Sequence, residues 1–226
     1  MPEGNGSLYP YDDVDNVNEM WWHILLTKLD AKLCVNQSQP SRNFVSSSTS
    51  NVSNAYNKLH RVKGQEYINL DGTKETATED IKPDIILIFL GHLDYVNNST
   101  LGEVSYTVGT EMTTDFCQGV NGLLYNLFTN IYPNAQIYLL DGIALGDKGF
   151  FAKNSSGKYY GEYIKAIREL GEMRGVHILH PSRICLFSLN EDNTDLVTND
   201  DNLKAKAMKL IANQCYHEML ADNCLE

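Results

Sequence analysis

The sequence K-P-D-I-I-L-I-F-L-G, residues 82–91, carries the clearest secondary-structure signal in this chain. Its six consecutive apolar residues, 85–90, lie between Asp84 and Gly91. A short apolar run bounded by a charged residue and a glycine is typical of a strand that is buried on both faces. Such strands belong to parallel sheets whose two faces are covered by helices. The stretch therefore predicts the interior of an α/β sheet.

The elements after this strand alternate between helix and strand. Helices are indicated by apolar residues at spacings of three and four, and strands by short apolar runs. In chain order we expect a helix over 116–131, a strand over 136–140, a helix over 163–173, a strand over 176–179 and a helix over 203–220. Pro133 ends the first of these helices, and Gly175 caps the second. This alternation predicts a three-layer α/β/α sandwich with a mainly parallel sheet.

The residues before the apolar strand are less regular. Asn16, with Glu19 three residues later, has the arrangement of a capping box, so we expect a helix that ends near Asp30. A strand-like run at residues 33–36 follows. Residues 36–80 hold few aliphatic side chains, and they predict a long loop with one short helix near 55–61.

Composition bears on the class of protein. With 18 Lys+Arg against 29 Asp+Glu, the net charge of −11 repels phosphate backbones, so nucleic acid is not an expected partner. No stretch approaches the roughly 20 apolar residues of a membrane helix, so no membrane span is expected. The N-terminus has neither a basic start nor an apolar core, which favours a cytoplasmic protein. The five cysteines lack zinc-site spacing, so we expect free thiols and neither metal nor cofactor.

Three segments resemble one enzyme family. K-P-D-I-I-L-I-F-L-G-H-L-D at residues 82–94 resembles the third conserved block of SGNH/GDSL hydrolases, K-P-D-hydrophobic-G-x-N-D. Residues 13–36, with V-D-N-V-N-E-M-W-W and L-C-V-N, are similar to the segment that leads into the second block in a bacterial subgroup of that family. Residues 132–137, Y-P-N-A-Q-I, are similar to the join between a helix and a strand in the same subgroup. Their order and spacing agree with that family. The resemblance implies a flavodoxin-like fold and hydrolysis of acyl esters of carbohydrates or lipids, in a single domain over residues 1–226.

The resemblance also implies a catalytic apparatus, which can be sought position by position. The family uses a nucleophilic Ser in G-D-S, a C-terminal His with an acidic partner, and an oxyanion hole built from backbone N–H groups and an Asn side chain. No G-D-S occurs in this sequence, and its first residues resemble the segment after the G-D-S strand, so we expect the first, central strand to be missing.

The other catalytic positions are substituted as well. The oxyanion glycine of block two falls at Ser41. In block three Gly91 matches, but the oxyanion Asn is Leu93, whose side chain cannot donate a hydrogen bond. At the C-terminus the acid and the His fall at Asn199 and Asn202.

Three local side chains remain as candidates for catalysis, namely Ser38 in the N-Q-S of block two and His92 and Asp94 after the apolar strand. His177 and His180 beside the last strand are interpreted as structural. We therefore expect an esterase-like protein with impaired catalysis. The alternatives are a truncated or divergent ester hydrolase with upstream or relocated catalytic residues, and a non-enzymatic binding or scaffold protein for a small ester or carbohydrate.

A missing central strand also has a structural consequence. Four parallel strands would remain, and residues 33–36 would pair directly with 84–90 or leave exposed backbone edges. Low stability, or a partner that fills the gap, is the expected result. The sequence leaves the oligomeric state open.

Overall fold

The core of the molecule is a three-stranded parallel sheet, seen in a computed structural model that describes residues 13–39, 42–45, 55–108, 115–143, 152–184, 196 and 203–222. The strands are β3 (Ile85–Ile88), β4 (Gln136–Leu140) and β5 (His177–Leu179), in the order β3-β4-β5. Ile85 of β3 pairs with Gln136, and Tyr138 of β4 pairs with His177.

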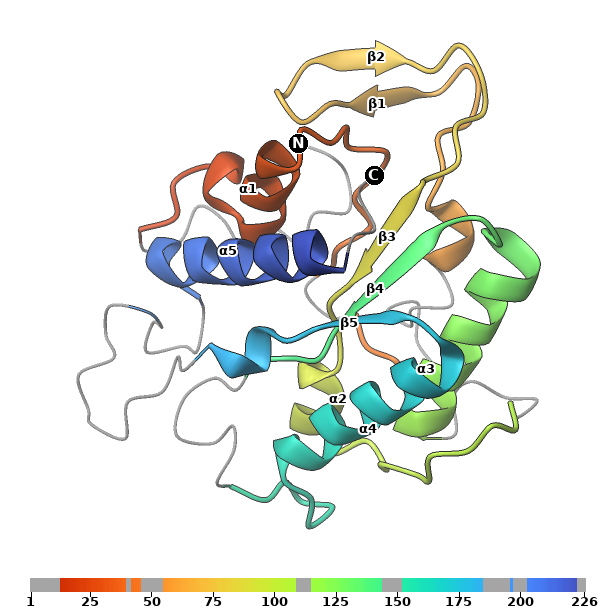
Figure 1. Ribbon diagram of the computed structural model, residues 1–226, viewed down its shortest axis with the longest axis vertical. Coiled ribbons are helices and arrows are strands. Elements are labelled where there is room, and N and C mark those ends of the chain that lie inside the picture. The colour runs from red at the N-terminus through yellow and green to blue at the C-terminus, as the bar shows by residue number, and fades with distance from the viewer. Residues whose placement is uncertain are drawn as a thin grey trace.

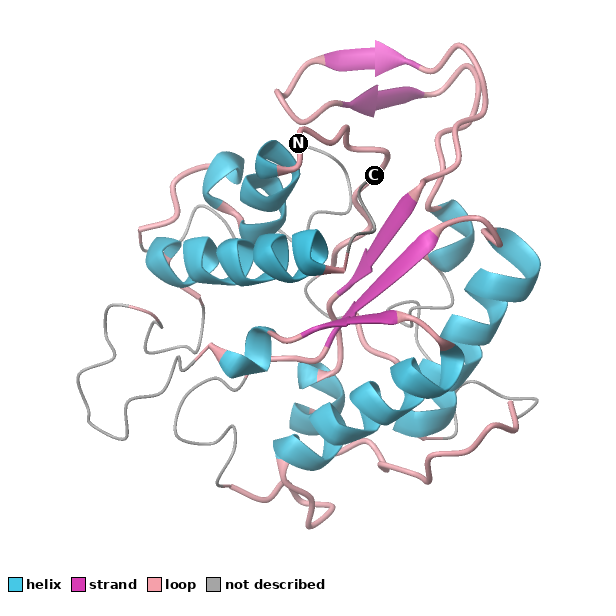
Figure 2. Ribbon diagram, viewed as in Figure 1, coloured by secondary structure: helices cyan, strands magenta, loops and turns pink. Residues whose placement is uncertain are grey.

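Helices cover both faces of this sheet (Figure 1). One face packs on α3 (Phe116–Asn126) and α4 (Tyr160–Arg174), and the other on α1 (Trp21–Lys28) and α5 (Ala205–Ala221). Successive strand residues alternate between the two layers, since Ile86 and Ile88 join the α3/α4 core whereas Leu87 joins the α1/α5 core. The predicted α/β/α sandwich with a parallel sheet is confirmed (Figure 2).

The local signals for helix ends are confirmed. The capping box of Asn16 and Glu19 is formed, although it caps a short 3-10 helix, η1 (Val17–Glu19), that precedes α1. A π-helical turn, η4 (Leu127–Ile131), extends α3 and ends before Pro133. Gly175, with φ of 69°, caps α4 in a left-handed conformation.

The predicted strand at residues 33–36 is wrong, because residues 31–39 adopt no regular structure. The buried guanidinium of Arg61 accounts for this: its Nη2 donates to the carbonyl of Leu33 at 2.7 Å, and its Nε to that of Cys34 at 2.8 Å. These carbonyls bind a side chain instead of a neighbouring strand. Within the described part of the chain the sheet therefore has three strands, where four were expected, and residues 33–36 do not pair with β3.

The expected loop over residues 36–80 contains an antiparallel hairpin that the sequence reading missed. Its strands are β1 (Glu66–Ile68) and β2 (Lys74–Thr76), drawn above the sheet in Figure 1. The turn between them contains Asp71 and Gly72, and Gly72 has φ of 83°. An Asp-Gly pair between two strands is a recognised hairpin signal. The short helix expected near 55–61 is present as η3 (Tyr56–Lys58).

Arg61 joins the hairpin to the body of the protein, so its replacement by methionine is expected to lower the free energy of unfolding by about 3 kcal/mol. Besides the two carbonyls, the guanidinium binds Asn69 Oδ1 at 2.9 Å and Glu75 Oε2 at 3.2 Å. Methionine would leave these acceptors without their donor. Urea denaturation monitored by circular dichroism measures the loss. Lys74→Met is the matched control, because the Lys74–Glu66 pair is largely exposed and should contribute under about 1 kcal/mol. Equal losses in the two variants would contradict the assignment.

Candidate functional site at the carboxyl edge of the sheet

The carboxyl ends of parallel strands are where α/β sheets bind ligands. Three turns meet this edge among the described residues, and they are residues 91–94 after β3, 141–143 after β4 and 180–183 after β5. The first contains four of the positions named from sequence, namely Gly91, His92, Leu93 and Asp94. The other two contain residues that the sequence reading did not select for function.

The turn after β3 begins at Gly91, which has φ of 112°. A Cβ atom there would lie 3.1 Å from the side chain of Ile167, so the chain leaves the strand through a position suited to glycine. The short helix α2 (His92–Val96) follows. Half-buried His92 packs edge-to-face on Tyr160, with ring centroids 5.3 Å apart. Half-buried Leu93 brings only hydrocarbon to the position where an oxyanion donor was sought.

Asp94 is fully buried and has a structural role. Its two carboxylate oxygens accept the backbone N–H groups of Phe44 and Val45, each at 2.9 Å, and the Ser99 side chain adds a third hydrogen bond. These bonds attach residues 42–45 to α2. Burial raises the pKa of Asp94 to about 6, and the hydrogen bonds oppose that rise only in part. Asp94 thus supports the edge of the sheet.

This raised pKa predicts how Asp94 affects stability as pH changes. The unfolded carboxyl loses its proton near pH 4, whereas the folded one keeps it to about pH 6. Between those values the unfolded state binds fewer protons, so the contribution of Asp94 to stability falls as pH rises. Asp94→Asn does not titrate. Its cost, from the lost acceptor, should therefore be about 2–3 kcal/mol larger at pH 4 than at pH 7. Urea titrations of both proteins at the two pH values measure this difference, and a cost that grows with pH would refute it.

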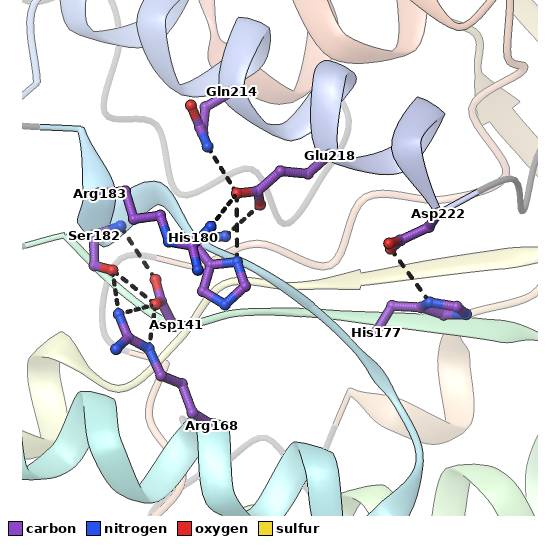
Figure 3. A network of polar contacts seen from close by, with 9 residues as sticks. All are labelled: Asp141, Arg168, His177, His180, Ser182, Arg183, Gln214, Glu218 and Asp222. Carbon is purple, nitrogen blue, oxygen red and sulfur yellow. Dashed lines mark hydrogen bonds and ion pairs between the residues drawn. The ribbon is translucent and has the colours of Figure 1, made fainter.

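A second polar cluster joins the ends of β4 and β5 (Figure 3). Asp141, whose side chain is fully buried, accepts the Nε of Arg168 at 2.7 Å. The same carboxylate accepts the backbone N–H of Ser182 at 3.1 Å and its hydroxyl at 2.7 Å. Arg168 Nη2 also donates to the Ser182 hydroxyl at 2.6 Å. The hydroxyl of Ser182 is thus held between a carboxylate and a guanidinium.

Glu218 of α5 organises a third cluster beside the second. One carboxylate oxygen accepts the backbone N–H of His180 at 2.6 Å, and the other lies 3.3 Å from the Nδ1 of the same imidazole. Gln214 donates to Glu218 at 2.7 Å, and Arg183 Nη1 lies 3.7 Å from it. Figure 3 shows Ser182 directed toward Asp141, while the His180 ring is directed toward Glu218. Described residues form no Ser–His hydrogen bond at this edge.

The candidates named from sequence have different outcomes. Ser38 is exposed, and its backbone N–H donates to Asn36 Oδ1 at 2.9 Å. The positions assigned to the block-two glycine, the acid and the base, namely Ser41, Asn199 and Asn202, lie outside the described residues. Gly91, His92, Leu93 and Asp94 share one turn at the sheet edge, as expected.

Comparison with known proteins now bears on this arrangement. The family model for GDSL-like lipases and acylhydrolases matches residues 4–183. The chain belongs to the GDSL-like lipase/acylhydrolase family. The match includes the turns after all three parallel strands. It confirms the family inferred from the K-P-D block.

Solved structures agree on the fold of this GDSL-like protein. A protein from Lactobacillus plantarum superposes with a TM-score of 0.64 at 18% identity, covering 94% of this chain and 92% of that chain. A structure described as a GDSL-like lipase from Bacteroides uniformis superposes with a TM-score of 0.62 at 18% identity. One from Bacteroides ovatus superposes with a TM-score of 0.58 at 20% identity. Each of the two alignments covers 96% of this chain and 84% of the other. A comparison with curated proteins gave no match.

Nowhere in the described ranges do three or more His, Cys, Asp or Glu side chains gather as metal ligands. None of the helices that could be searched has the length and apolar character needed to cross a membrane.

The sequence reading missed the Asp141–Ser182 and His180–Glu218 contacts, although Asp141 and His180 each directly follow a predicted strand. That placement was the signal that could have identified them.

Proposed function

We propose that this GDSL-family chain has impaired ester hydrolysis and acts through binding of a small ester or carbohydrate. The observation that carries the proposal is Leu93, an apolar side chain in the first turn of α2 where the family resemblance calls for an oxyanion donor. Loss of one such donor alone typically lowers turnover by about 10²–10³-fold.

The environment of the other polar groups supports the same proposal. The hydroxyl of Ser182 donates to Asp141, and the carboxylate of Asp94 accepts backbone N–H groups. A serine becomes a nucleophile when a neighbouring imidazole can accept its proton. Among the described residues the Ser182 hydroxyl is bonded to Asp141 and Arg168 and to no imidazole, so this contact favours structure over acyl transfer.

Activity measurements on the full chain test this proposal. We expect hydrolysis of p-nitrophenyl acetate close to the rate in buffer, and no stoichiometric labelling by a fluorophosphonate probe. Leu93→Asn restores a donor at the oxyanion position, and we expect it to leave the rate unchanged because a donor alone supplies no nucleophile. Clear turnover with covalent labelling of a serine would overturn the proposal. A rise of ten-fold or more in Leu93→Asn would show instead that the remaining apparatus is intact.

A second candidate, ester hydrolysis by relocated groups, is favoured by one observation. His180 is held by Glu218 in the way that a catalytic imidazole is oriented by an acid, and Ser182 lies two residues away. If turnover is found, Ser182→Ala and His180→Ala should each abolish it. Ser38→Ala tests the other serine candidate, and it should leave turnover unchanged because its exposed side chain lies outside this cluster.

A further inference from the structure

Residues 42–45 lie beside the turn after β3, and Asn43 among them is buried. Asp94 of that turn accepts the backbone N–H of Phe44 at 2.9 Å, and the Phe44 ring packs edge-to-face on Phe116 with centroids 5.4 Å apart. Asn43 directly precedes Phe44, and only 5% of its surface is exposed. These contacts hold Asn43 next to the turn that contains Leu93 and Asp94, at the carboxyl edge of the sheet.

The side-chain amide of Asn43 differs from that of a second buried asparagine, Asn121. The Oδ1 of Asn121 accepts from Arg174 Nε at 2.7 Å, and its Nδ2 donates to the carbonyls of Ser105 and Thr107 at 2.9 and 3.2 Å. The Oδ1 of Asn43 is buried as well, but among the described residues no donor binds it. A buried carbonyl without a donor lowers the stability of a protein, so each such group needs an explanation. A role in ligand binding supplies one.

The chemistry of the amide indicates which ligand it would bind. An amide oxygen accepts hydrogen bonds and the amide nitrogen donates them, whereas neither atom is charged. A hydroxyl group both donates and accepts, so it can pair with either end of the amide, but a simple acyl ester has no donor for the oxygen. Rotation about the Cβ–Cγ bond of asparagine is soft, so the amide can turn toward the exposed part of Asn43 without a change in the backbone.

We propose that the side-chain amide of Asn43 is a ligand-binding group of the candidate site and that it selects a carbohydrate over a simple acyl ester. This inference rests on the function proposed above and chooses between the two ligand classes named there. A bound hydroxyl group supplies the donor that the buried oxygen lacks, whereas an ester leaves that oxygen unpaired. A site that is built to bind a hydroxyl group discriminates strongly against a ligand without one.

An NMR titration of the full chain tests the contact. The probes are the methyl glycosides of glucose, xylose and N-acetylglucosamine, with ethyl acetate as the ester. We expect the side-chain NH₂ signal of Asn43 to shift with at least one glycoside and not with ethyl acetate. The NH₂ signal of Asn121 is the internal control and should not shift, because its bonds to the protein are complete. No shift of the Asn43 signal with any glycoside would overturn the proposal, and so would a shift with ethyl acetate.

The stability of Asn43→Ala gives a second measurement that needs no ligand. No described donor loses its acceptor in this variant, so we expect the equilibrium constant for unfolding to rise by no more than about three-fold, the effect of a small cavity. Asn121→Ala is the matched control. It should raise the constant by about 30-fold or more, because Arg174 and two carbonyl groups lose their partner. Equal increases in the two variants, measured by urea denaturation, would show that Asn43 serves the fold.

Both measurements are independent of ester hydrolysis, so they separate this inference from the proposed function. Clear turnover of p-nitrophenyl acetate together with a glycoside-dependent shift of the Asn43 signal would overturn the proposed function and leave the contact in place. Absence of both turnover and shift would overturn the role of Asn43 alone. If Asn43→Ala does not fold, the Asn43 residue is structural and the proposal fails by the stability criterion.

Discussion

Gly142→Ala is expected to lower the free energy of unfolding by about 4 kcal/mol, which is a large part of the 5–15 kcal/mol typical of a folded domain. Gly142 follows Asp141 at the end of β4 and has φ of 115°, a conformation that other residues rarely adopt. A Cβ atom at this position would lie 2.5 Å from the hydroxyl oxygen of Tyr160. Tyr160 is buried and cannot move aside without disturbing the turn after β3. Backbone strain and the steric clash therefore add together.

Chemical denaturation of two further variants separates the cost of the backbone strain from the cost of the steric clash. Gly157→Ala is the matched control, because Gly157 also has a positive φ, of 75°, but a Cβ atom there would have no other atom within 4 Å. It should cost only the strain, about 1–2 kcal/mol. Tyr160→Phe removes the clashing oxygen, so Gly142→Ala/Tyr160→Phe should cost less than the sum of the two single changes. A loss in Gly142→Ala no larger than that in Gly157→Ala would show that the turn accommodates a side chain.

The elements that were predicted correctly from sequence depend on nearby residues. The apolar run of β3, the helical spacing of α3 and the glycine cap of α4 are each contained within one window of the chain. Residues 33–36 look like a strand in the same kind of window, but a side chain from Arg61 binds their carbonyl groups. That contact joins residues 27 and 28 positions apart, and local pattern alone does not reveal it.

The residues of the candidate site differ in the same way: some could be placed from nearby sequence, and others only from contacts between distant segments. Leu93 and Asp94 could be placed at the end of β3 because the K-P-D block fixes their position. Asp141 and Ser182 are 41 residues apart, and their contact depends on the parallel pairing of β4 with β5. Sequence alone did not establish that these two strands are neighbours. Their place after the apolar strand suggested His92 and Asp94 as candidates for catalysis. The structure adds that the carboxylate of Asp94 is buried and accepts two backbone N–H groups, which sequence alone did not reveal.

Arg168→Met is expected to destabilise the protein by about 3–5 kcal/mol, because it leaves the carboxylate of Asp141 buried without its cation. Arg168 supplies two contacts to this carboxylate, from Nε at 2.7 Å and from Nη2 at 2.6 Å. The loss should depend on pH in a defined direction. An unpaired buried carboxylate favours its neutral form, so the variant should lose less stability at pH 5 than at pH 8. Urea denaturation at the two pH values measures both effects.

Removal of both partners distinguishes the ion pair from the packing of the arginine side chain. Asp141→Asn should cost less than Arg168→Met, since it leaves a guanidinium with 39% of its side chain exposed to solvent. Arg168→Met/Asp141→Asn should recover part of the loss seen in Arg168→Met, because the buried charge is then absent. It should also lose the pH dependence, whereas Ser182→Ala, which keeps both charges, should not acquire one. A contrary outcome is a loss of unfolding free energy in the double variant that equals the sum of the losses in the two single variants. In that case Arg168 stabilises this edge of the sheet through contacts other than its pairing with Asp141.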